Sequence, residues 1–98
     1  MTARPRILDA GPASTLAEGG WRTVRDGDLE IVVVRSDGRL YALEDACSHD
    51  TMRLSEGWLC EGTLVCPRHA ARFRLTDGEP LCPPAYQAVR TFPVDVVN

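Results

Sequence analysis

The apolar residues of this chain occur in short runs that turn residues separate. The longest β-branched run is Ile31-Val32-Val33-Val34, within the segment 29–35. β-branched side chains favour strands, and a continuous apolar run in a strand indicates that both of its faces are buried. We therefore predict a strand over 29–35 that is covered on both sides.

Turn signals divide the rest of the chain into further strand-sized segments. Asp26-Gly27-Asp28 precedes the long run, Asp37-Gly38 follows it, and Asp77-Gly78 recurs later; Asp-Gly is a strong hairpin signal. Pro93 indicates an edge or a bulge in the last segment. The shorter predicted strands are 21–24, 40–43, 58–59, 63–65, 73–75 and 89–97. No apolar stripe of period 3.6 spans three turns, so the pattern predicts one all-β domain over 1–98.

Composition narrows the class of protein without naming it. The 98 residues are 44% hydrophobic and 26% charged, which is ordinary for a globular domain. A net charge of -3 argues against nucleic acid as a partner and suits basic docking surfaces on other proteins. Arg4 and Arg6 have no apolar run behind them, so we expect no signal peptide, no membrane span and a cytoplasmic location.

The candidate chemistry lies in two Cys-plus-His boxes. Cys47-Ser48-His49 and Cys66-Pro67-Arg68-His69 are separated by sixteen residues and contain both histidines of the chain. In a reducing compartment, four cysteines with two histidines indicate metal binding before disulfides. Thiolates with imidazoles suit zinc or an iron–sulfur cluster. Because each box carries one Cys and one His, a dinuclear cluster with Cys on one iron and His on the other fits the pattern; a zinc-stapled β domain is the alternative.

At these residues the chain resembles the Rieske [2Fe–2S] family. Leu54-Ser55-Glu56-Gly57 before the second box and Arg90-Thr91-Phe92-Pro93-Val94 near the end are also similar to that family. The resemblance implies a Rieske-like antiparallel β-sandwich with a small cluster-binding subdomain, over about 45–84, that carries two ligand loops. It implies one [2Fe–2S] cluster per chain, with the inner iron held by Cys47 and Cys66 and the outer iron held by His49 and His69.

Departures from the family pattern indicate a subtype. Met52 and Arg68 stand where high-potential members carry bridging cysteines, and Ala71 and Phe73 stand where they carry hydroxyls. Hydroxyl donors stabilise the more negative reduced cluster, so their absence lowers the reduction potential. We predict a potential near the low end of the Rieske range, about -150 mV. Ala70 replaces a usual glycine, which leaves the fine geometry of the second loop open.

The resemblance also implies a function. It implies a one-electron ferredoxin that passes electrons from a flavin-dependent NAD(P)H reductase to a terminal non-heme iron oxygenase, such as an aromatic-ring dioxygenase. Docking would be transient and the chain a monomer. Catalysis by the chain alone is not expected, because a mononuclear iron needs two further histidines. The alternatives are an accessory or regulatory Rieske subunit, in iron–sulfur assembly or a nitrite-reductase-like complex, and a structural zinc module.

Other residues carry weaker signals. Cys60 and Cys82 are expected to be small buried or half-buried thiols, with a disulfide between them disfavoured. Trp21 and Trp58 are expected to pack in the core. Two further sets flank the boxes: acidic residues that could face a basic partner (Asp45, Asp50, Glu56) and apolar residues that could form a collar around the metal (Met52, Leu54, Pro67, Pro83, Pro84).

Overall fold

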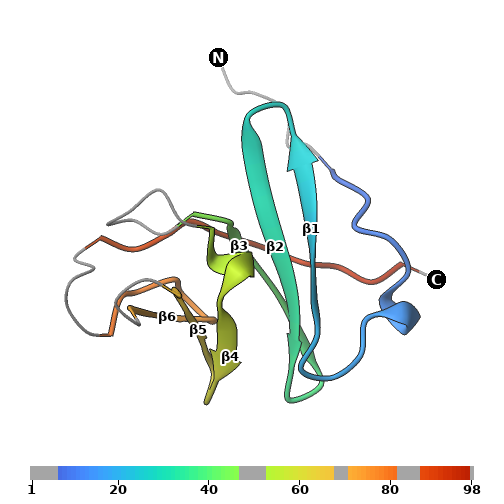
Figure 1. Cartoon of the computed structure of the whole chain (residues 1–98). Helices are drawn as coiled ribbons and strands as arrows, with labels where there is room; N and C mark the ends of the chain where they lie inside the picture. Colours follow the sequence, from blue (N-terminus) through green and yellow to red (C-terminus); the bar gives the residue numbers. More distant parts are fainter. Residues whose placement is uncertain (1–6, 47–52, 68–70, 82–86, 98) are drawn as a thin grey trace.

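Two antiparallel sheets make up the described part of the molecule (Figure 1). The structure is a computed structural model that describes residues 7–46, 53–67, 71–81 and 87–97. Sheet A has the strand order β1-β2-β3-β7, and sheet B has the order β4-β5-β6. The elements are η1 (Ala13–Thr15), β1 (Trp21–Asp26), β2 (Leu29–Ser36), β3 (Arg39–Glu44), η2 (Leu54–Glu56), β4 (Trp58–Cys60), β5 (Thr63–Val65), β6 (Arg72–Arg74) and β7 (Thr91–Phe92), where η denotes a 3-10 helix. The predicted all-β fold is confirmed.

Tight turns fix the register of the hairpins. Asp37 and Gly38, between β2 and β3, have φ values of 53° and 74°. Glu61 and Gly62, between β4 and β5, have φ values of 47° and 77°. Two successive residues at positive φ are typical of the turn whose twist matches paired strands. Both turns lie where the sequence predicts a break between strands.

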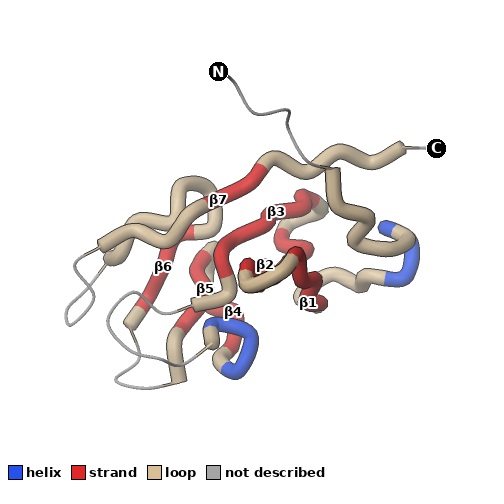
Figure 2. The backbone as a smooth tube through the Cα atoms, turned by 90° about the horizontal axis from the view of Figure 1, so that it is seen from above, coloured by secondary structure: helices blue, strands red, loops and turns tan. Residues whose placement is uncertain are grey.

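β2 contributes to two separate apolar cores, one on each face of sheet A. Val32 and Val34 lie in the first core, which sheet B covers, and Ile31 and Val33 lie in the second. The first core is Val32, Val34, Leu43, Leu54, Leu64, Cys66, Ala71, Phe73, Leu75 and Val89; the second is Leu16, Ile31, Val33 and Ala42. Figure 2 shows sheet A between sheet B and the N-terminal segment that carries η1. Burial of β2 on both faces, as predicted, is confirmed.

Two arginines of sheet A hold the N-terminal segment against the second core. The Arg35 guanidinium donates to the carbonyl oxygens of Leu16 and Ala13, at 2.7 and 2.9 Å. Arg22 donates to the carbonyl oxygen of Ala10 at 3.0 Å. These bonds satisfy carbonyls that no strand pairs, so a segment without strands covers the outer face of sheet A.

Two predictions about the strands and the core are wrong. The predicted closing strand over 89–97 shrinks to β7, because Pro93 has no N–H with which to continue the ladder. Trp58 does not pack in the core, since its side chain is 47% exposed. Its neighbour Leu59 packs against the first core, and alternation along a strand turns Trp58 to the opposite face. Trp21 is half-buried against the first core, as expected.

Candidate metal centre

Of the four predicted ligands, the structure describes Cys66. Cys47, His49 and His69 lie outside the described residues. Within the described ranges, no three His, Cys, Asp or Glu side chains gather in a way that could hold a metal ion. The geometry near the proposed site is therefore described through the segments that lead into and out of the two boxes.

The second box begins from the buried strand β5. Cys66 follows β5 directly, is fully buried and belongs to the first core. Its N–H donates to the carbonyl oxygen of Ala71 at 2.7 Å, and Val65 pairs with Arg72 across the ladder. The chain therefore leaves and returns at directly opposite positions. Ala71 and Phe73 are both fully buried. They are the two residues that the sequence places where high-potential proteins carry hydroxyl groups.

A buried carboxylate joins the two ends of the first box. Asp45 follows β3, is 4% exposed, and its N–H donates to the carbonyl oxygen of Glu30 at 2.8 Å. Its Oδ1 accepts a hydrogen bond from the N–H of Ser55, and its Oδ2 accepts one from the Oγ of Ser55, both at 2.7 Å. We call this pair of bonds the Asp45–Ser55 clasp. It brings residue 45 and residue 55 together across the segment that contains Cys47 and His49.

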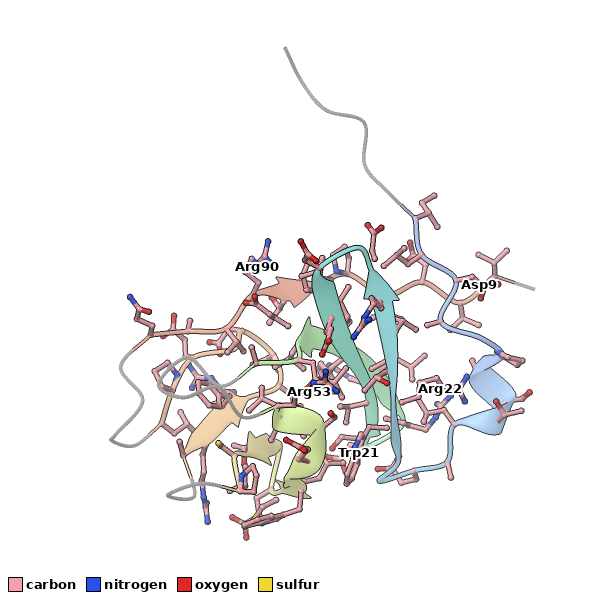
Figure 3. All side chains as sticks on the ribbon, turned by 45° about the horizontal axis from the view of Figure 1, so that its top comes forward. Asp9, Trp21, Arg22, Arg53 and Arg90 are labelled. Carbon is pink, nitrogen blue, oxygen red and sulfur yellow. The ribbon has the colours of Figure 1, made fainter. Side chains whose placement is uncertain are left out.

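η2, which carries Ser55, is also tied to sheet A. The Arg53 guanidinium contacts both carboxylate oxygens of Glu30, at 2.8 and 2.9 Å, and Glu30 also accepts from Arg25 at 2.7 Å. The indole N–H of Trp21 donates to the carbonyl oxygen of Ser55 at 3.1 Å. Figure 3 shows Trp21 and Arg53 where η2 approaches the β1–β2 hairpin. The far end of the first box is therefore anchored to the larger sheet.

A glycine lets the stems of the two boxes touch. Gly57 ends η2, and a Cβ built on it would lie 1.7 Å from the carbonyl oxygen of Val65 and 3.3 Å from the Cδ of Pro67. No side chain fits at such a distance, so the main chain after the first box packs directly against the main chain that precedes Cys66. This contact fixes how far apart the two stems lie.

A third segment lies beside β6. The N–H of Leu81 donates to the carbonyl oxygen of Arg72 at 2.9 Å, and Pro80 forms a bridge with Phe73. Gly78, at φ 73°, lies so close to Val89 that a Cβ would meet its carbonyl oxygen at 2.1 Å. The predicted turn at Asp77-Gly78 is found here. An Arg74 ion pair at 2.7 Å holds the pKa of the exposed Asp77 carboxyl below its usual range.

The other sequence candidates are placed as follows. Asp45 does not face a partner, because the clasp buries it, and Leu54 is fully buried in the first core and cannot form a collar. Glu56 is exposed, Pro67 is half-buried, and Cys60 is a half-buried free cysteine. The remaining candidates lie outside the described residues (Asp50, Met52, Arg68, Ala70, Cys82, Pro83, Pro84).

Two positioning residues, Ser55 and Gly57, escaped sequence reasoning. Both belong to the four-residue stretch 54–57 that is similar to the Rieske family, which was the available signal. Their roles depend on partners that are distant in sequence, Asp45 and Val65, and no local pattern predicts these pairings.

The residues present fit a thiolate-ligated metal cluster. Cys66 is fully buried among apolar side chains, where an uncompensated thiolate would be costly and a bound metal would stabilise it. The donor set of the two boxes is two sulfurs and two imidazoles, which suits an iron–sulfur cluster of mixed ligation.

Comparisons with known proteins agree on one family. Residues 7–93 match the model of the Rieske [2Fe-2S] domain. The chain is 32% identical over 91 residues to the ferredoxin component of the naphthalene 1,2-dioxygenase/salicylate 5-hydroxylase systems of a Ralstonia species, covering 93% of this chain and 88% of the relative.

Solved structures show the same similarity. One is the complex of reduced oxygenase and oxidized ferredoxin in carbazole 1,9a-dioxygenase, with a TM-score of 0.87, 34% identity and coverage of 92% of this chain and 84% of the other. Another is the ferredoxin of carbazole 1,9a-dioxygenase from Nocardioides aromaticivorans, with a TM-score of 0.86, 27% identity and coverage of 92% and 88%. No helix in the described part of the chain is long and apolar enough to cross a membrane.

Proposed function

The chain belongs to the Rieske [2Fe–2S] family, whose cofactor is a [2Fe–2S] cluster, and on this premise we propose that it is a ferredoxin that carries one electron at a time. It would accept the electron from a flavin-dependent NAD(P)H reductase and pass it to a terminal non-heme iron oxygenase of the aromatic-ring dioxygenase type. The observation that carries this proposal is the match to a ferredoxin component over 93% of this chain and 88% of the relative.

The proposed ligands are Cys47 and Cys66 for the inner iron and His49 and His69 for the outer iron. The two stems support this set, because the Asp45–Ser55 clasp closes the first box and Gly57 brings its end against the strand that delivers Cys66. We propose residues 45–84 as the cluster-binding subdomain. Within the described residues, sheet B lies at the centre of this range.

The protein's own residues prepare the site for electron transfer. When bound, the cluster with these ligands supplies a neutral oxidised form that becomes singly negative on reduction. The main-chain bond to Ala71 holds the backbone of Cys66, the residue proposed as a ligand of the inner iron, in place. The apolar side chains around Cys66 exclude water from this end of the site. A rigid, dry surrounding keeps reorganisation small when the charge changes.

The partners follow from the same proposal. Aromatic-ring dioxygenase systems need a carrier that meets two proteins in turn, so docking is transient and sensitive to ionic strength. The net charge of -3 suits basic surfaces on both partners. The chain acts as a cytoplasmic monomer and performs no catalysis alone.

Stopped-flow mixing tests the function directly. The chain is reduced by a dioxygenase-system flavin reductase with NADH, and is then mixed with an oxidised aromatic-ring dioxygenase. We expect the absorption of the oxidised carrier to bleach in the first step and return in the second. A chain that holds its cluster but exchanges electrons with neither protein would favour the accessory-subunit alternative.

A further inference from the structure

Asp45 is a buried charge that the ligand set does not use. It is 4% exposed, and both carboxylate oxygens accept hydrogen bonds from Ser55. Among the described residues, no Arg side chain forms an ion pair with Asp45, whereas Glu30 pairs with Arg25 and Arg53. The clasp therefore satisfies the carboxylate with hydrogen bonds, and no cationic side chain of the described ranges pairs with its negative charge.

This charge lies close to the proposed site by chain length alone. Asp45 precedes Cys47 by two residues, and two residues span at most about 7 Å. Salt screens exposed charges strongly but screens buried charges much less. The field of the buried Asp45 carboxylate is therefore screened less than that of an exposed carboxylate.

We infer that Asp45 sets the reduction potential: its buried negative charge, which pairs with no Arg side chain in the described part of the chain, lowers the potential, and Ser55 keeps the carboxylate in place. This rests on the proposed function, in which the reductase flavin gives up one electron and the cluster gains it. The reduced cluster is more negative by one charge, so a fixed negative charge nearby opposes reduction. Asp45 gains and loses nothing in this step.

Glu44 offers a matched comparison within the same strand end. It precedes Asp45 by one residue and carries the same charge, but its side chain is 31% exposed. It also pairs with Arg90 at 3.3 Å, and solvent screens both groups. Removing the charge of Glu44 should therefore change the potential little, although its distance along the chain from Cys47 is similar.

Three substitutions separate charge from structure. Asp45→Asn removes the charge but can keep both bonds, since its amide oxygen can accept from the Ser55 N–H and its NH₂ can donate to Oγ. Glu44→Gln removes an exposed charge of the same sign. Ser55→Ala removes one bond of the clasp and keeps the Asp45 charge.

The experiment is an EPR-monitored redox titration of the four cluster-loaded proteins at one pH and ionic strength. We expect Asp45→Asn to shift the midpoint potential upward by clearly more than Glu44→Gln, and Ser55→Ala to stay near wild type. Equal shifts in Asp45→Asn and Glu44→Gln would overturn the inference, because burial would then not matter. An upward shift in Ser55→Ala as large as that of Asp45→Asn would also overturn it, because loop distortion would then explain both.

A second neutral variant, Asp45→Ser, guards against a misfolded Asp45→Asn. If neither neutral variant binds a cluster while Ser55→Ala does, the inference fails, since Asp45 would then be needed for cluster binding. Failure of the proposed function has a different signature. In that case the wild-type protein itself would show no one-electron titration, whatever the variants do.

Discussion

Sheet A and sheet B reach the same antiparallel geometry by different means. Three strands of sheet A, β1 to β3, are six or eight residues long, and β2 buries alternate side chains in two cores. The strands of sheet B are three residues long, and the first core covers one face. Long patterned strands specify their own pairing, whereas three-residue strands need support from outside. The proposed cluster-binding region is thus the region whose strand pairing the local sequence specifies least.

The support for sheet B comes from contacts between distant residues. The clasp, the Gly57 contact with Val65 and the bridge between Phe73 and Pro80 all join segments that are separated in sequence. Ligands on both stems add another cross-link when metal is bound, and metal binding then contributes folding free energy. We therefore expect sheet A to tolerate loss of the cluster and sheet B to depend on it.

Removing a ligand should have the largest effect. Cys66→Ala is expected to abolish the visible absorption of the cluster completely, because Cys66 is one of the two proposed thiolate ligands. Hydrogen exchange should then speed up at amides of β4–β6 while amides of β2 keep their protection. Cys60→Ala, at a half-buried free thiol of the same sheet, is the matched control and should retain its colour. Equal loss of protection in both sheets would contradict the division between them.

Adding a side chain at the contact between the two stems should have the second largest effect. Gly57→Ala places a methyl group 1.7 Å from the Val65 carbonyl oxygen, so main chain must move. We expect a loss of about 3 kcal/mol in the free energy of unfolding and a lower yield of cluster. Gly62→Ala is the control: it meets no atom within 4 Å and bears only the strain of φ 77°, about 1 kcal/mol. Chemical denaturation measures both, and equal losses would show that the stem contact is unimportant.

Substitutions at two neighbouring core residues allow the two faces of β2 to be compared. Val34 faces the first core and Val33 the second, and each is 5% exposed or less. Truncation to Ala should cost about 2 kcal/mol at either position. Only Val34→Ala should shorten the half-life of the cluster against a chelator, since only that core reaches Cys66. A matching decrease in Val33→Ala would mean that the two cores are not separate.

The sequence predicts more of sheet A than of the region around sheet B. The β-branched run of β2 and the Asp37-Gly38 turn predict strand, register and burial, because these signals act between near neighbours. The boxes predict the ligands through residue type and spacing. Burial of Asp45 by Ser55 and exposure of Trp58 were not predictable, since the first depends on how η2 docks and the second on which face of β4 lies against the first core.

The smallest expected effect concerns acid stability of sheet A. The exposed Glu18 carboxylate accepts from the N–H groups of Gly38 and Asp37, at 2.8 and 2.6 Å. These bonds lower the pKa of Glu18 from its ordinary value of 4.5. The stabilisation is therefore present above pH 4.5 and is lost as pH falls through the lower folded pKa.

Melting curves at several pH values test this. Glu18→Gln should melt below wild type at neutral pH, and the difference should close in acid. A difference that stays constant down to pH 2 would show that the carboxylate charge is not involved. Cluster absorption should be unchanged, because Glu18 lies at the sheet A turn between β2 and β3.

The most direct test of the central claim is metal analysis combined with an EPR-monitored redox titration of the purified chain. We expect iron and acid-labile sulfide in equal amounts, and a rhombic EPR signal that appears in a one-electron step at about -150 mV. A colourless protein with stoichiometric zinc, in which no such signal appears on reduction, would contradict it.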